Sequence, residues 1–143
     1  RGNLLQRSLA FSVNAFRKNK NGFFIMAEGA QVDWAAHHNK LEWMVQEVQD
    51  LDRAIGDMMR FVDENKETLL IVTADHETGG LTLLNGSLET GKVAGQFSSD
   101  DHSAVCVPVF AYGPQSNLFT GVYSNTEIFS KIMFLFNKNK TGK

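Results

Sequence analysis

The sequence predicts an α/β fold, a three-layer α/β/α arrangement around a mostly parallel sheet. Three observations lead to this class: short apolar runs alternate with long amphipathic stretches, the runs are too continuous for half-exposed strands, and a loop-rich insert at 79–101 precedes the last run. Continuous apolar runs are typical of parallel strands that are covered on both faces. A length of 143 residues fits a single domain, residues 1–143.

The expected strands are short and apolar, and glycine bounds two of them. They are Phe23–Ala27, Leu69–Val72 and Val107–Tyr112. Inside the insert, Leu81–Leu84 and Val93–Phe97 are expected to form two further short strands around Asn85-Gly86, a dipeptide that favours turns.

The expected helices show apolar residues at helical spacing. One stretch extends from Leu5 to Phe16 and a longer one from Leu41 to Val62. A last helix is expected from Ser124 or Asn125, because Ser124 and Glu127 fit a capping box.

Composition excludes several classes of function. The net charge of −2 gives no indication of a nucleic-acid or membrane-surface binder, and no apolar run approaches the length of a membrane span. The single cysteine, Cys106, excludes an internal disulfide, and its Val-Cys-Val-Pro setting predicts a small buried residue. Because the chain starts at Arg1 without an initiator Met, we expect either a processed start or a piece of a longer protein.

Segments rich in carboxylates and imidazoles flank all three expected strands. Glu28 to His38 follows the first strand, Thr73 to Gly80 follows the second, and Ser98 to His102 precedes the third. All four histidines fall in these segments. Ligands of parallel α/β sheets bind beyond the carboxyl ends of the strands. Mixed oxygen and nitrogen ligands would suit Zn²⁺, whereas an all-oxygen site would suit Mg²⁺.

The spacing inside these segments allows a shared site but does not require one. Asp33 and His37 lie four residues apart, so a helical turn would place both on one face. Asp75 and His76 are adjacent, and both reach one site only from an extended or turning backbone. Taken singly, loop histidines are usually solvated, Glu28 could cap the following helix and Asp75 could stabilise a turn. The joint pattern favours a metal site.

The same segments resemble the alkaline phosphatase family. Glu28 to His37 is similar to its EGxxIDxxxH signature, and Thr73 to Gly80 is similar to its TADHxTGG segment. His102 with Val107–Pro114 resembles its H-[TS]…VPVxAYGP block. The resemblance extends from about residue 8 to residue 137 and implies that the chain is the carboxy-terminal part of the family fold.

The resemblance also implies a reaction and a set of ligands. The reaction is phosphate monoester hydrolysis at a two-zinc plus magnesium site through a phosphoserine intermediate. The implied ligands are Asp33, His37 and His102 for the first zinc, Asp75 and His76 for the second zinc, and Glu28 for magnesium. His38 and Glu77 match no ligand position of the family.

The family's nucleophilic Ser and phosphate-binding Arg have no counterpart here. Both belong to its amino-terminal half, and no serine of this chain stands in an Asp-Ser-Ala setting. Ser103 matches a family Thr/Ser that is not the nucleophile. We therefore expect an alkaline phosphatase as the parent protein, with a phosphomonoester substrate, and an isolated chain that is inactive.

Two other functions stay open. One is a zinc-binding module without catalysis, and the other is a related hydrolase such as a sulfatase, a phosphodiesterase or a phosphomutase. The spacing from Glu28 to His37 and the Ala-Tyr-Gly-Pro block favour alkaline phosphatase. The residues do not indicate a compartment, whereas the resemblance implies a periplasmic or extracellular location. Because a divided sheet exposes a strand edge, we also expect homo-oligomers.

Overall fold

The computed structural model describes residues 2–141, which divide into two compact units. The first unit contains the chain up to Phe61 together with His76–Cys106, and the second contains Val62–Asp75 and the chain from Val107 onward. Each unit is therefore built from two separate stretches of sequence.

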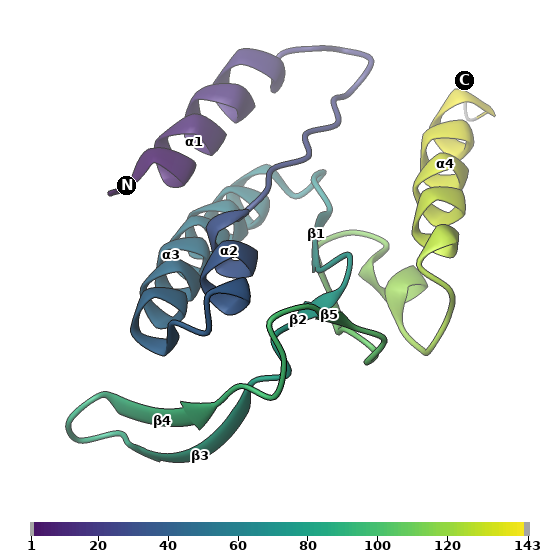
Figure 1. The fold of residues 1–143 in the computed structure, drawn as a ribbon. Coiled ribbons are helices and arrows are strands. Elements are labelled where there is room, and N and C mark those ends of the chain that lie inside the picture. Colours follow the sequence, from purple (N-terminus) through teal and green to yellow (C-terminus); the bar gives the residue numbers. More distant parts are fainter. Residues whose placement is uncertain (1, 142–143) are drawn as a thin grey trace. The chain divides into compact units, whose positions relative to one another are not determined.

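Three helices form where apolar residues recur at helical spacing (Figure 1). They are α1 (Leu4–Phe16), α2 (Gln31–His37) and α3 (Leu41–Asn65). The expected helices over Leu5–Phe16 and Leu41–Val62 are thus confirmed. The turn between α2 and α3 includes Asn39, whose φ of 52° lies in the left-handed region that asparagine tolerates better than most residues.

Each described strand pairs with one other strand, and every pair is antiparallel. The pairs are β1 (Leu70–Thr73) with β6 (Val109–Tyr112), β2 (Glu77–Thr78) with β5 (His102–Ser103), and β3 (Thr82–Ser87) with β4 (Lys92–Gln96). Two of the three apolar runs, near Leu70 and Val109, are confirmed as strands.

The predicted three-layer arrangement around a mostly parallel sheet is wrong for the described residues. They contain three two-stranded antiparallel sheets and no parallel pair. Parallel neighbours need a crossover, usually helical, but the chain between β1 and β6 forms only strands and turns. An apolar run predicts burial of a strand and gives no information about the direction of its partner.

The expected first strand, Phe23–Ala27, does not form among the described residues. The segment is irregular, and Phe24 and Met26 are 62% and 76% exposed. A strand exists only where its backbone groups pair with a neighbour, and this segment has no ladder partner in the described part of the chain.

The insert forms a hairpin with a different turn from the one predicted. Asn85 and Gly86 lie inside β3, and residues 88–91 form the turn to β4. The register shifts between Leu83 and Asn85, and the Gly86 N–H is 2.7 Å from Asn85 Oδ1. The irregularity that the Asn-Gly pair introduces is therefore a register shift within the strand and not the hairpin turn.

The second unit ends in a short 3-10 helix, η1 (Ser116–Phe119), and a long helix, α4 (Thr126–Thr141). The Ser124 N–H donates to Glu127 Oε1 at 3.3 Å, which is one half of the predicted capping box. Phe119 is only 3% exposed and belongs to the core of this unit.

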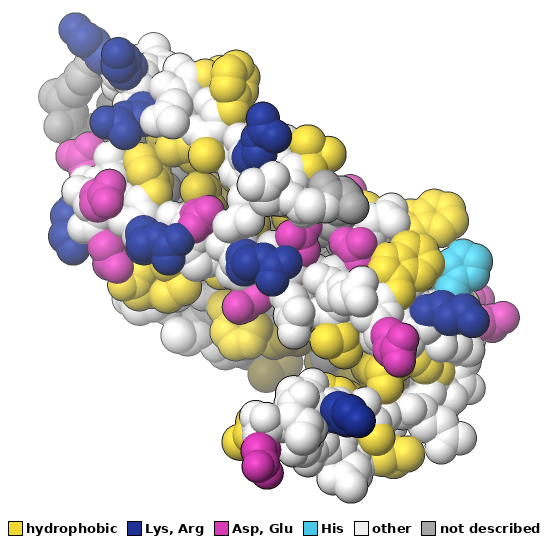
Figure 2. Space-filling model, turned by 90° about the vertical axis from the view of Figure 1, so that its left-hand side faces the viewer, with side chains coloured by type: hydrophobic (Ala, Val, Ile, Leu, Met, Phe, Trp, Pro, Cys, Tyr) yellow, Lys and Arg dark blue, Asp and Glu magenta, His cyan; other side chains and the backbone are white. Residues whose placement is uncertain are grey.

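Much apolar surface stays uncovered among the described residues. Figure 2 shows hydrophobic side chains spread over the visible face, and Phe11 is 77% exposed. Cys106 is also exposed, so the predicted buried position is wrong. Among residues 2–141, every helix is too short or too polar to traverse a lipid bilayer.

Candidate metal centre

Helix α2 and strand β5 bring three potential metal ligands together in the first unit. Asp33 and His37 lie one turn apart on α2, as their spacing predicted, and His102 begins β5. Asp33 Oδ1 is 3.5 Å from His37 Nε2 and 3.7 Å from His102 Nε2. The two Nε2 atoms are 3.1 Å apart. These are the three residues that the resemblance assigned to a first zinc.

The hydrogen bonds of His37 determine which of its nitrogens is free. Its Nδ1 lies 2.6 Å from the backbone oxygen of Asp100. A carbonyl oxygen only accepts, so Nδ1 carries the hydrogen and the neutral ring has its lone pair on Nε2. That lone pair faces Asp33 and His102, which is the orientation that a metal ligand needs.

Thr78 connects this group to a third histidine. Its Oγ1 donates to Asp33 Oδ1 at 2.6 Å and lies 3.1 Å from His76 Nδ1. The hydroxyl has one hydrogen, which is directed at Asp33, so Oγ1 accepts from His76 Nδ1–H. The His76 lone pair is therefore on Nε2. The His76 ring stacks on His102 with centroids 3.5 Å apart.

The geometry of the three ligand atoms fits zinc. Zinc–ligand bonds of about 2.0–2.1 Å in a tetrahedron place neighbouring ligand atoms about 3.3 Å apart. The three separations, 3.1, 3.5 and 3.7 Å, lie around that value. Two imidazole nitrogens and one carboxylate oxygen are also a ligand set that zinc accepts, and three protein ligands leave one position for water or substrate.

The other predicted ligands lie outside this group. Among the described residues, Asp33, His37 and His102 are the one set of three or more His, Cys, Asp or Glu side chains close enough to share an ion. Glu28 is exposed in the irregular segment before α2, and Asp75 is exposed at the end of a stretch of the second unit.

His38, to which the resemblance gave no ligand role, lies outside the group. Its ring stacks on Trp43 at a centroid distance of 5.9 Å. Thr78 and Glu77 also contact this part of the chain, although the sequence predicts no role for either. Their contacts depend on the register of β2 against β5, and the short polar alternation of these strands gave no signal of that pairing.

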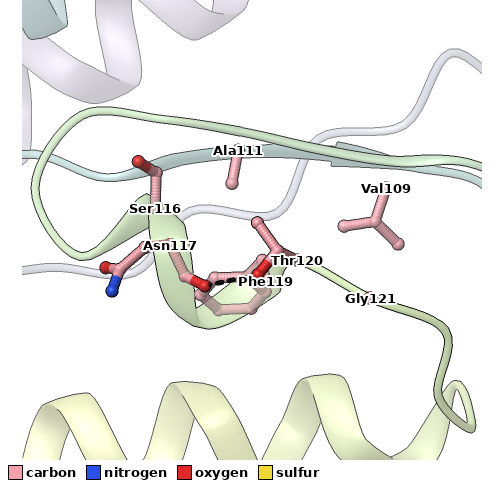
Figure 3. Close-up of a pocket in the computed structure, with 7 residues that line it drawn as sticks. All are labelled: Val109, Ala111, Ser116, Asn117, Phe119, Thr120 and Gly121. Carbon is pink, nitrogen blue, oxygen red and sulfur yellow. Dashed lines mark hydrogen bonds between the residues drawn. The ribbon is translucent and has the colours of Figure 1, made fainter.

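The second unit has a separate shallow hollow of about 360 Å³ beside β6 and η1 (Figure 3). Its lining consists of Val109, Ala111, Ser116, Asn117, Phe119, Thr120 and Gly121. None of these side chains is charged, and none is a metal ligand of the His, Cys, Asp or Glu type. The candidate group of Asp33, His37 and His102 lies in the first unit.

Comparison with known sequences gives one consistent family. The model of the alkaline phosphatase family matches residues 4–96 and 90–138. Alkaline phosphatase 4 of Bacillus subtilis is 28% identical, over 92% of this chain and 42% of that protein. Alkaline phosphatase H of Pseudomonas aeruginosa is 32% identical, over 88% of this chain and 30% of that protein. The chain thus spans less than half the length of these relatives.

Solved structures give the same result. The alkaline phosphatase of the Antarctic bacterium TAB5 matches with a TM-score of 0.88 and 42% identity, over 96% of this chain and 42% of that one. A variant of that enzyme, solved with Mg bound in the M3 site, matches with a TM-score of 0.87 and 40% identity.

Proposed function

Because this chain belongs to the alkaline phosphatase family, we propose that it is the metal-binding portion of a phosphomonoesterase. The observation that carries the proposal is the convergence of Asp33 Oδ1 with the Nε2 atoms of His37 and His102. A ligand set of this kind with an open fourth position is typical of catalytic zinc and differs from closed structural sites.

In this proposal the chain's own residues hold and orient the first zinc. Zinc bound there supplies a Lewis acid for a phosphoryl oxygen and lowers the pKa of a coordinated water. The Asp100 carbonyl fixes the His37 ring, and Thr78 fixes the Asp33 carboxylate. Such outer hydrogen bonds keep ligand atoms aimed at the metal.

We assign the second zinc to Asp75 and His76 and magnesium to Glu28. The stacking of the His76 ring on His102, with centroids 3.5 Å apart, supports a neighbouring site. The TAB5 variant, a member of the same family, binds Mg in its M3 site, and this supports the assignment of a magnesium ligand in this chain. The remaining ligands, the nucleophilic Ser and the phosphate-binding Arg would come from other parts of a longer protein.

Zinc titration by calorimetry tests the first site. We expect the chain to bind zinc and the double variant Asp33→Ala, His37→Ala to lose that binding. The matched control is His38→Ala, which removes the adjacent histidine but leaves the ligand group intact. Equal zinc affinity in the double variant and the unmodified chain would refute the assignment.

An activity assay tests the missing nucleophile. With zinc and magnesium supplied, we expect negligible hydrolysis of a generic phosphomonoester by the 143-residue chain. Robust turnover that disappears in His102→Ala would contradict this. A longer product of the same gene that carries an Asp-Ser-Ala segment should hydrolyse the ester. A zinc-binding full-length product without that segment would favour the alternative, a non-catalytic zinc module.

A further inference from the structure

We propose that Glu77 is a positioning residue that holds His102 in place for metal binding, an inference that rests on the proposed zinc site. Glu77 lies on β2 directly opposite Ser103 of β5, and Thr78 lies opposite His102. The Glu77 side chain accepts from the Gly80 N–H at 2.7 Å through Oε1, and its Oε2 accepts from the Ser103 hydroxyl.

The strand that carries His102 needs such support. The β2–β5 pair consists of two register pairs only, and a ladder of this length is weak by itself. The His102 side chain is 46% exposed, so the rings packed against it restrain its position only in part. A carboxylate that accepts two hydrogen bonds across the pair adds a restraint that the backbone does not supply.

Glu77 acts on His102 from both sides along the chain. After His102, it accepts from the next residue, Ser103. On the other side, Glu77 accepts from the Gly80 N–H. The adjacent Gly79 donates its N–H to the backbone oxygen of Asp101, the residue before His102, at 3.0 Å. Glu77 is therefore connected to Ser103 directly and to Asp101 through the Gly79-Gly80 backbone.

A direct role as a ligand does not fit Glu77. It is not in the group formed by the three converging ligand atoms, and its two oxygens are directed at Gly80 and Ser103. Its effect on a bound metal would pass through His102. Loss of an outer partner of this kind typically weakens metal affinity about 10–100-fold.

The test compares Glu77→Ala, Glu77→Gln and the unmodified 143-residue chain. Zinc affinity is measured by competition with a chromophoric chelator, and Co²⁺ is added separately to record its visible absorption bands, which report ligand geometry. We expect Glu77→Ala to bind zinc about tenfold more weakly and to change the Co²⁺ spectrum. Glutamine can still accept from Gly80 and can donate to the Ser103 oxygen, so Glu77→Gln should restore affinity to within about threefold.

One control variant and two possible results decide between the inference and the proposed function. Glu89→Ala, a change of the same kind in the hairpin turn, should leave affinity and spectrum unaltered. If the unmodified chain binds zinc through Asp33 and His37 but Glu77→Ala binds equally well with the same spectrum, the inference fails and the proposed function stands. If the unmodified chain binds no zinc, the proposed function itself fails.

If Glu77→Ala does not fold, a second variant, Ser103→Ala, still tests the inference. Ser103→Ala removes one donor to the same carboxylate and leaves Gly80 in place. We expect it to weaken zinc binding several-fold, and unchanged affinity would overturn the inference.

Discussion

Thr78 Oγ1 lies 2.6 Å from Asp33 Oδ1, the same carboxylate oxygen that faces the imidazoles of the candidate zinc site. Thr78 is 8% exposed, so water competes little for this bond. The hydroxyl also accepts from His76 Nδ1–H and so links the two proposed zinc sites through one side chain. The relative orientation of two proposed ligands, Asp33 and His76, therefore depends on a residue outside the proposed ligand set.

Replacing Thr78 by valine should weaken the first zinc site. Valine keeps the shape of the side chain but removes the hydroxyl that donates to Asp33 and accepts from His76 Nδ1–H. We expect zinc affinity to fall about tenfold. The free energy of unfolding of the metal-free chain should fall by about 1 kcal/mol. Thr78→Ser, which keeps the hydroxyl, is the control. Equal zinc affinity for valine and serine variants would contradict the proposed link.

Zinc should stabilise the folded chain measurably. A ligand that binds only the folded state at about 100-fold above its Kd raises the free energy of unfolding by about 2.7 kcal/mol. We expect zinc to raise the urea midpoint of the unmodified chain and a chelator to reverse the effect. His37→Ala should abolish the response, whereas His38→Ala should retain it. A zinc-dependent shift of equal size in His37→Ala would argue against ligation by that imidazole.

The helices were predictable because their signal is local. The apolar spacing that begins at Leu5 and at Leu41 determines both α1 and α3 without reference to any other segment. The Asp33–His37 spacing likewise placed both side chains on one face of α2. In each case, the residues that fix the geometry lie within a few positions of one another.

The strand directions and the supporting residues were not predictable for the opposite reason. Whether β1 meets β6 in parallel or antiparallel depends on residues about 40 positions apart, and the apolar runs are similar in both cases. Glu77 and Thr78 gain their roles only because β2 pairs with β5 in one register. A shift of one residue would place both side chains on the opposite faces.

Gly113, which directly follows β6, should resist substitution more than a glycine with the same backbone geometry elsewhere. Its φ is 103°, and an added Cβ would lie 2.5 Å from the Thr68 carbonyl oxygen and 2.9 Å from Val62 Cγ1. Gly121 has a φ of 104° with open space around it, so a substitution there reports the cost of backbone strain without a steric clash.

We expect Gly121→Ala to cost about 1–3 kcal/mol from strain. Gly113→Ala should cost about 2 kcal/mol more, because a backbone oxygen cannot move aside as a side chain can. Urea unfolding of the two variants gives the difference directly. Equal losses would show that the contact with Thr68 relaxes without cost.

The Tyr112–Asp63 hydrogen bond should make stability depend on alkaline pH. Tyr112 Oη donates to Asp63 Oδ1 at 2.7 Å, and this bond, together with the negative charge of Asp63, raises the pKa of Tyr112 above its ordinary value of 10.0. A raised pKa in the folded state means that the folded chain holds its proton longer than the unfolded chain. The stabilisation is therefore complete below pH 10 and is lost as the pH rises through the folded pKa.

Urea unfolding of the unmodified chain and Tyr112→Phe between neutral pH and pH 11 tests this sign. The unmodified chain should be the more stable one at neutral pH, and the difference should shrink above pH 10 as the phenol ionises beside Asp63. Asp63→Asn keeps a hydrogen-bond acceptor but removes the charge, so its alkaline loss should be smaller than that of the unmodified chain. A difference between the unmodified chain and Tyr112→Phe that stays constant to pH 11 would show that this bond does not couple folding to the tyrosine proton.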